Sequence, residues 1–252
     1  MNLLTLARDL RRRKARERNA LFVAEGLRTV EELLRSSLET RGVLVSAQFS
    51  ESSRGEALIA QLGARGVPMQ TVSEKEFATA AETESPQGVL AIAATPSIRL
   101  EDLALPSSCR ILVLDAIQDP GNGGTILRTA AALDATATFA LPGTVDLWNA
   151  KVVRSGMGAH FHHPCIAGTW NELDAFRVAH SVTLWAADAS GESLESLDRP
   201  ARLALILGNE GSGLSDDSRS RADTLVSLPI AESTESLNVA VAAGILLYEL
   251  RR

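Results

Sequence analysis

The first part of the chain alternates short apolar runs with amphipathic stretches. Each run is bounded by glycine, proline or a charged residue, as is typical of strands in a sheet. The runs fall at 21–26, 42–47, 68–72 and 88–94. Between them, Leu27, Val30, Leu33 and Leu34 recur at helical spacing, and residues 55–63 form a second helical pattern that ends in glycine. The pattern predicts a small α/β domain over residues 1–95.

Residues 96–108 contain two prolines and show no sustained period, and we interpret them as a linker. A second alternating series follows this linker. The series predicts strands separated by stretches of helical length, which implies a mostly parallel sheet in a domain over 109–252. Parallel sheets bind ligands beyond the carboxyl ends of their strands. The strands are expected at 111–114, 137–141, 182–186, 203–207 and 225–228, so the loops after Leu114, Leu207 and Leu228 are the places to search for a site.

Composition narrows the class of protein. The chain has 252 residues, is 45% hydrophobic and carries a net charge of −6. The fraction of apolar residues is that of a globular protein, and no apolar run approaches the length that spans a bilayer, so a cytoplasmic protein with no membrane partner is expected. The two cysteines, Cys109 and Cys165, form no CxxC pair, which argues against a disulfide framework or a cysteine zinc site.

Charge is distributed unevenly along the chain. Residues 1–100 hold 14 Lys and Arg against 12 Asp and Glu, whereas the remainder holds 11 against 19. Basic residues are concentrated between Arg8 and Arg18, where Asp9 and Glu17 are the two acidic residues. Such a run can neutralise several phosphates of a nucleic acid, although it is equally compatible with a solvated helix face. The RNA-binding candidates within it are Arg11, Arg12, Arg13 and Lys14.

The three loops carry unusual chemistry. The first, from Asp115, contains a proline and three glycines before a helix expected to begin near Asn122 or Thr125, and Asn122 would be its N-cap if the turn is merely structural. The second, LGNEGSG from Leu207, is not the GxGxxG dinucleotide fingerprint, and the chain lacks a GK[ST] phosphate loop. Its Glu210 disfavours a phosphate and favours a cationic or zwitterionic ligand. The third loop, after Leu228, leads to a helix that is apolar on nearly every side. Ser236 could be an ordinary N-cap of this helix.

In this order and spacing the three loops resemble the motifs of the SpoU (TrmH) family of RNA 2'-O-ribose methyltransferases, within the SPOUT superfamily. Asn122 with Arg128 and Thr129 matches the first motif, LGNEGSG the second, and Pro229 with SLNVAVAAGILLYE the third. KVVRSGMGAHF, from Lys151, is similar to an intermediate segment of the family. The basic run, FVAEG and ESPQGVLAI resemble the substrate-binding domain that precedes many of its catalytic domains.

The resemblance implies S-adenosylmethionine as methyl donor, a deep trefoil knot in the second domain, and a homodimer that completes the site across its interface. It implies ribosomal RNA as substrate, ahead of transfer RNA, because the chain carries the separate N-terminal domain. Arg154 joins the RNA-binding candidates through the intermediate segment. The implied catalytic residues are Asn122, Arg128, Glu210, Ser236 and Asn238, and the implied cofactor-binding residues are Leu207, Gly208, Asn209, Gly211, Leu228, Ile230 and Leu237.

Two features depart from the family pattern or compete with it. Glu232 stands where the third motif usually has glycine, which supports an alternative class, a non-catalytic RNA-binding protein that kept the fold. His160, His162 and His163 lie near Cys165, and on a strand the first two would share a face. We expect no metal there, because the further ligands of a zinc site are missing and the implied chemistry needs none. A nucleotide-dependent oxidoreductase is disfavoured because its fingerprint is missing.

Overall fold

The computed structural model describes residues 2–231 and 233–251 and divides the chain into two compact units. The first unit comprises residues 1–97 together with 148–162, and the second comprises 98–147 together with 163–252. Residues 148–162, which the sequence pattern had grouped with the second domain, therefore pack within the first unit. Among the described residues, no helix is long and apolar enough to cross a membrane.

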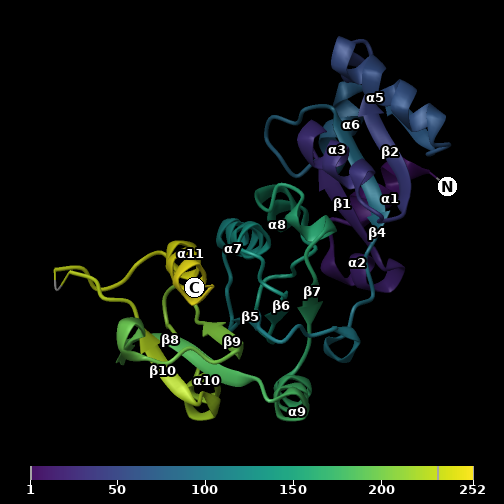
Figure 1. The fold of residues 1–252 in the computed structure, drawn as a ribbon. Helices are drawn as coiled ribbons and strands as arrows, with labels where there is room; N and C mark the ends of the chain where they lie inside the picture. The colour runs from purple at the N-terminus through teal and green to yellow at the C-terminus, as the bar shows by residue number, and fades with distance from the viewer. Residues whose placement is uncertain (1, 232, 252) are drawn as a thin grey trace. The chain divides into compact units, whose positions relative to one another are not determined.

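The first unit is a four-stranded sheet in the order β1-β4-β2-β3, with helices on both faces (Figure 1). β4 is antiparallel to β1 and β2, whereas β2 and β3 are parallel. Its elements are α1 (Leu3–Asp9), α2 (Arg13–Asn19), β1 (Leu21–Glu25), α3 (Leu27–Arg35), β2 (Thr40–Ser46), α4 (Ala47–Ser50), α5 (Ser53–Ala64), β3 (Met69–Val72), α6 (Glu74–Ala80), β4 (Val89–Ala94), α8 (Ala150–Ser155) and the 3-10 turn η2 (Ala159–Phe161).

Successive strand residues of this sheet point into two different cores. Leu90 and Ile92 pack with α1 and α6 on one face, whereas Val89 and Ala91 pack with α3 and α5 on the other. Because both faces are covered, β1 and β4 are apolar at nearly every position, which accounts for their continuous apolar runs in the sequence. α6 is stabilised by a capping box between Ser73 and Glu76, a local signal that the sequence analysis had not used.

The second unit is a six-stranded sheet in the order β10-β8-β9-β5-β6-β7, and every neighbouring pair is parallel. The expected parallel sheet is confirmed. Helices α9 and α10 lie on one face and α7 and α11 on the other (Figure 1). The elements are η1 (Leu100–Asp102), β5 (Cys109–Leu114), α7 (Pro120–Ala132), β6 (Ala137–Ala140), β7 (Cys165–Ala167), α9 (Trp170–His180), β8 (Thr183–Ser193), η3 (Leu194–Ser196), β9 (Arg202–Leu207), α10 (Asp216–Arg221), β10 (Thr224–Ser227) and α11 (Val239–Leu250).

Three structural alternatives that the sequence left open do not hold. Asp119, not Asn122, is the N-cap of α7, because the helix begins earlier, at Pro120. Asn238, not Ser236, is the N-cap of α11, and its side-chain oxygen accepts hydrogen bonds from the backbone N–H groups of Ala240 and Val241. His160 lies in a 3-10 turn rather than on a strand, so strand alternation does not relate it to His162.

Candidate active site

The site lies at the carboxyl ends of β5, β9 and β10, where the three unusual loops of the second unit meet. β5 and β9 are adjacent and in register, with Leu114 paired to Leu207. The loops that leave these strands therefore start side by side, as the position of ligand sites in parallel sheets predicts.

The glycine loop after β9 is closed by a short bridge. Asn209 and Gly213 exchange two backbone hydrogen bonds, of 2.8 and 3.0 Å, and the Asn209 side-chain oxygen accepts from the N–H groups of Gly211 and Ser212. Gly213 has a φ of +71°, and a Cβ on Gly208 would lie 2.5 Å from the backbone of Gly213. Glycine is therefore required at both positions, and the loop presents bare backbone to the space in front of it.

A chain of side-chain hydrogen bonds joins the three motifs. The Asn122 side-chain N–H donates to Glu210 Oε1 at 3.0 Å, and the Asn238 side-chain N–H donates to Asn122 Oδ1 at 3.0 Å. Glu210 also accepts from the backbone N–H groups of Gln118 and Asp119 at 3.2 and 3.1 Å. Glu210 is thus fixed to the first loop, and Asn122 connects it to the start of α11.

The same contacts set the protonation state of Glu210. Partial desolvation acts to raise its pKa, but the hydrogen bonds from the Asn122 side chain and from the backbone N–H groups together lower the pKa below its ordinary value. Glu210 is therefore ionised at neutral pH, and it accepts hydrogen bonds rather than donating a proton.

A cavity of about 560 Å³ opens beside this chain of hydrogen bonds. Its described lining includes three carboxylates, those of Asp188, Glu210 and Glu235, and no Lys, Arg or His. The remaining lining is largely apolar side chains and glycine backbone. A cavity of this volume, lined by acidic side chains, suits a small organic molecule that carries positive charge.

The cavity brings together most of the residues that the sequence had assigned to the site. Of the twelve catalytic and cofactor-binding candidates, the cavity is lined by Asn122, Leu207, Gly208, Asn209, Glu210, Gly211, Leu228, Ile230, Ser236, Leu237 and Asn238. Arg128 is the exception: it is exposed on α7 and does not line the cavity. Glu232 lies outside the described residues.

Sequence reasoning missed one wall of the cavity. β10 pairs with β8 through a register shift, so that Leu225 faces Ala186 but Val226 faces Glu192. The intervening residues 187–191 bulge out of the ladder, and Ala187, Asp188 and Ala189 line the cavity. Gly191 is the sequence signal for this bulge, since a Cβ there would lie 2.5 Å from the Leu225 backbone.

Asp188, within this bulge, is held by two partners. It forms an ion pair with Arg219 at 2.6 Å, and its Oδ1 accepts from the backbone N–H and hydroxyl of Ser190. Burial acts to raise its pKa, but the hydrogen bonds from Ser190 and the bond and charge of Arg219 bring it below its ordinary value. Asp188 therefore places a carboxylate in the cavity wall whose charge is balanced by Arg219.

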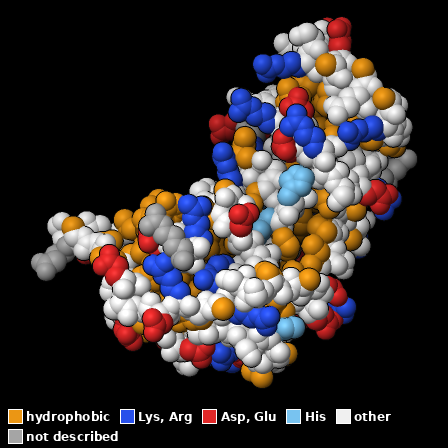
Figure 2. All heavy atoms as spheres, in the orientation of Figure 1, with side chains coloured by type: hydrophobic (Ala, Val, Ile, Leu, Met, Phe, Trp, Pro, Cys, Tyr) orange, Lys and Arg blue, Asp and Glu red, His pale blue; other side chains and the backbone are white. Residues whose placement is uncertain are grey.

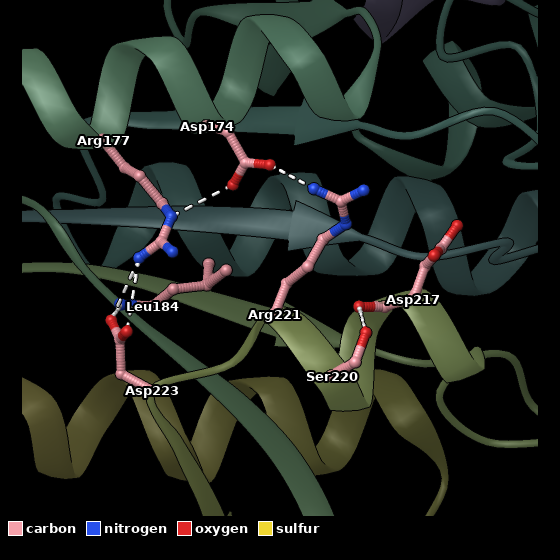
Figure 3. Close-up of polar contacts among 7 residues, drawn as sticks. All are labelled: Asp174, Arg177, Leu184, Asp217, Ser220, Arg221 and Asp223. Carbon is pink, nitrogen blue, oxygen red and sulfur yellow. Dashed lines mark hydrogen bonds and ion pairs between the residues drawn. The ribbon is translucent and has the colours of Figure 1, made fainter.

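Helix α10, which follows the glycine loop, is anchored at both ends. At its start the buried carboxylate of Asp115 accepts from the Ser215 N–H at 2.8 Å and the Ser218 hydroxyl at 2.6 Å. At its end Arg221 pairs with Asp174 of α9 (Figure 3). Asp174 also pairs with Arg177 at 3.1 Å, and Arg177 in turn with Asp223 at 3.2 Å. These contacts fix the segment that runs from the glycine loop to β10.

The RNA-binding candidates all lie in the first unit. Arg12 pairs with Asp9, Arg13 pairs with Glu17 at 2.7 Å, and Arg11 donates to the carbonyl of Thr79 at 3.2 Å. Lys14 is exposed on α2 and Arg154 lies on α8. On the face in Figure 2, Lys and Arg side chains alternate with acidic ones over much of the surface.

The histidines and cysteines do not form a metal site within the described part of the chain, where no group of three or more metal-binding side chains was found. His163 is buried, and its Nε2 lies 2.8 Å from the Thr138 hydroxyl. Burial lowers the pKa of His163 to about 4, so its ring is neutral at neutral pH. Cys165 is buried beside it as a free thiol.

The fold and the site define an α/β protein with a cavity lined by carboxylates, apolar side chains and glycine at the carboxyl edge of a parallel sheet. The chain belongs to the SpoU rRNA methylase family, whose model matches residues 110–248. Residues 5–91 match the MRM3-like substrate binding domain. The family assignment made from the three motifs is confirmed.

Individual relatives agree with the family match over nearly the whole chain. The chain is 33% identical to the 23S rRNA (guanosine(2553)-2'-O)-methyltransferase RlmP of Bacillus subtilis, over 97% of this chain and 94% of that protein. An AdoMet-bound rRNA methyltransferase from Sinorhizobium meliloti superimposes with a TM-score of 0.86 at 30% identity, over 100% of this chain and 94% of that one. The SpoU methyltransferase AviRb from Streptomyces viridochromogenes, in complex with AdoMet, gives a TM-score of 0.88 at 27% identity, over 100% and 97%.

Proposed function

We propose that this protein transfers the methyl group of S-adenosylmethionine (AdoMet) to a ribose 2'-hydroxyl of ribosomal RNA. The observation that carries the proposal is the chain of hydrogen bonds from Glu210 through Asn122 to Asn238, which assembles all three family motifs at the rim of one cavity. Ribosomal RNA is favoured over transfer RNA because relatives that match nearly the full length of the chain are named for it. The proposal includes a cytoplasmic location, because the rRNA methyltransferases that the chain resembles are bacterial.

The residues that line the cavity fit AdoMet. Gly208 and Gly211 offer backbone where a larger side chain would intrude or narrow the space, and Leu207, Leu228 and Leu237 supply apolar surface for an adenine ring. The carboxylates match the positive charges of a sulfonium and an ammonium group. When bound, AdoMet supplies an electrophilic methyl group on a sulfonium leaving group. The deep knot that the resemblance implies, formed by the second and third motifs, belongs to this proposal.

The reaction requires the ribose oxygen to lie in line with the methyl group, to lose its proton and to be shielded from competing water. Asn122, Ser236 and Asn238, at the rim of the cavity, have the hydrogen-bonding groups to orient a ribose. A guanidinium is a poor general base, so we assign Arg128 to holding the neighbouring phosphate and stabilising the alkoxide that develops. Glu210 positions Asn122 and carries no proton to transfer.

A second copy of the chain is part of the proposal. α11 leaves Val241, Ile245 and Tyr248 at 52%, 41% and 39% exposure, and Figure 2 shows hydrophobic side chains at the surface in this region. These side chains would be buried in a homodimer. Because Arg128 and Ser236 are exposed, groups from the second copy could approach them and complete the site.

RNA contact by the first unit is also proposed, through Arg11, Arg12, Arg13 and Lys14 of the basic segment and through Arg154. Lys and Arg side chains at these positions can neutralise backbone phosphates. Their exposure, apart from the partly buried Arg154, makes them accessible to a large polyanion.

The experiment that tests the proposed function is a calorimetric titration of AdoMet into the purified protein, followed by transfer of labelled methyl groups to ribosomal RNA. Binding followed by label in a ribose is the expected result. Binding of RNA without any binding of AdoMet would instead identify a non-catalytic member of the family.

A further inference from the structure

A second cavity, of about 820 Å³, lies wholly within the first unit. Arg28, Arg54 and Arg154 line it, and we call it the arginine cavity. None of the three guanidinium groups forms an ion pair or hydrogen bond with another described residue, and Arg154 Nη1 is buried without a partner. Burying an unpaired cationic donor is costly, so a ligand that accepts hydrogen bonds and carries negative charge would remove this cost.

The carboxylate in the arginine cavity does not neutralise these arginines. Glu25 is 1% exposed, and its side chain accepts hydrogen bonds from the backbone N–H of Glu82 and from the N–H and hydroxyl of Thr83. Glu25 therefore serves to hold the 82–83 loop. The net charge that the cavity presents to a ligand is positive.

Two of the arginines occupy unfavourable places for a cation. Arg28 is the second residue of α3 and Arg54 the second residue of α5, helices of 9 and 12 residues. The first turn of a helix carries the positive end of its dipole, where anions are favoured and cations are not. Both helix starts line the same cavity. Two arginines at two helix N-termini form an arrangement that an anion would stabilise and that has no evident structural benefit without one.

The start of α3 offers further unused donors. Its N-cap is Gly26, which provides no side-chain cap, and within the described chain the N–H groups of Arg28 and Thr29 have no acceptor. Thr29 itself is 4% exposed. The first N–H groups of a helix have no acceptor within the helix, so these two donors are available to a ligand.

Apolar groups line the cavity beside the cations. Leu27, Phe49 and Met157 contribute to its wall, and Met157 is 39% exposed. The volume exceeds what an isolated phosphate fills, and the mixed lining suits a nucleotide, whose phosphate needs cations and whose base needs an apolar surface.

We propose that the arginine cavity binds single-stranded RNA, with its phosphates on Arg28, Arg54 and Arg154 and an unpaired base or ribose against the apolar wall. The proposal rests on the proposed function and names where the first unit holds the substrate. Unpaired bases fit because a concave site can admit splayed nucleotides, which a stacked duplex does not offer. By contrast, Arg12 and Arg13 of the basic segment are already paired with Asp9 and Glu17.

The test compares two double variants of the full-length protein, Arg28→Ala with Arg54→Ala and, as a control, Arg35→Ala with Arg41→Ala. The control removes two exposed arginines of the same unit that do not line the cavity. Binding of a labelled single-stranded RNA is measured over a series of salt concentrations. The cavity variant should bind at least about tenfold more weakly and lower the slope of log affinity against log salt by about 1.4, since each lost phosphate contact on a single strand contributes about 0.7.

Two further readouts separate this proposal from the proposed function. AdoMet affinity should be unchanged in both variants, because the AdoMet cavity belongs to the second unit. The melting temperature of the cavity variant should stay level or rise, because two cations leave helix N-termini. Failure of the wild-type protein to bind AdoMet would count against the proposed function and not against the cavity.

Three outcomes would overturn the proposal. The cavity variant could bind the labelled RNA as tightly as wild type. Both double variants could lose equal affinity, which would indicate a general charge effect. Finally, inorganic phosphate alone could bind the wild-type cavity as tightly as the RNA does, which would identify a site for a free anion.

Discussion

Single side chains in the second unit have distinct tasks that their geometry separates. Asn122 uses its amide twice, donating to Glu210 and accepting from Asn238, so it links loops that are far apart in the sequence. Arg128, six residues further along, is exposed and makes no hydrogen bond within the described chain. The first side chain organises the site, and the second is free to meet a substrate.

Replacing Arg128 should therefore remove catalysis without changing the affinity for the cofactor. We expect Arg128→Ala to lower the single-turnover rate of methyl transfer by about 10²–10³-fold, the effect of losing one electrostatic contact to a developing oxyanion. AdoMet affinity, measured by calorimetry, should stay within error because Arg128 does not line the cavity. Near-normal turnover in this variant would contradict the assignment.

His163 should make folding stability depend on pH. Its pKa is about 4 in the folded protein and 6.5 in a model peptide, because burial disfavours the charged ring. The unfolded chain therefore takes up the proton first. Above pH 6.5 the titration of His163 does not change the free energy of unfolding. Between pH 6.5 and 4 it lowers this free energy, and below pH 4 the effect is constant, at a total loss of about 3 kcal/mol.

Urea denaturation over that pH range measures the effect. The matched variant His163→Gln keeps a polar side chain near Thr138 but cannot titrate, so its stability should show a correspondingly smaller fall. If both proteins lose stability in parallel between pH 6.5 and 4, another group is responsible.

At the scale of elements, α10 is the rigid connection between the glycine loop and β10. Asp115 holds its first turn, and Asp174 holds its last residue through Arg221 (Figure 3). The two anchors differ in burial: Asp115 is 4% exposed, whereas the Asp174 and Arg221 side chains are 28% and 36% exposed. Buried hydrogen bonds to a charge contribute more than partly exposed ion pairs.

Removing the two anchors should have different consequences. Asp115→Ala leaves the Ser215 N–H and the Ser218 hydroxyl without their acceptor, and we expect it to lower the free energy of unfolding by about 2–3 kcal/mol and to weaken AdoMet binding. Asp174→Ala should cost about 1 kcal/mol and leave AdoMet affinity unchanged. Asp115→Asn, which keeps an acceptor oxygen, should recover part of the affinity. Equal effects of the two alanine variants on AdoMet would refute this division.

At the scale of the whole molecule, the exposed apolar face of α11 predicts self-association. We expect Ile245→Asp to shift the protein from dimer to monomer in sedimentation velocity and to abolish methyl transfer, because a charge would be buried in the interface. Val178→Asp is the matched control, since Val178 is more exposed, at 76%, but lies on α9. A wild-type protein that sediments as a monomer, or dissociation of both variants, would contradict the dimer.

The sequence determined most of the elements that build the two sheets and predicted which loops carry the site, because both depend on local patterns. The continuous apolar runs of β1 and β4 and the helical spacing in α3 follow from which faces each element buries, and they were readable without coordinates. The resemblance of the three motifs to the SpoU family pointed to eleven of the residues that line the cavity. β7 escaped because three residues are too few to display a period.

Tertiary structure decided which of those residues touch, because that depends on strand order and register. The parallel pairing of β5 with β9 brings Glu210 to Asn122, and the register shift between β8 and β10 brings Asp188 into the cavity wall. Asp119 and Asn238 are the helix caps because α7 begins at Pro120 and α11 begins at Val239. Residues 148–162 joined the first unit because Val153 and Phe161 are buried in its core, a long-range contact that no local pattern encodes.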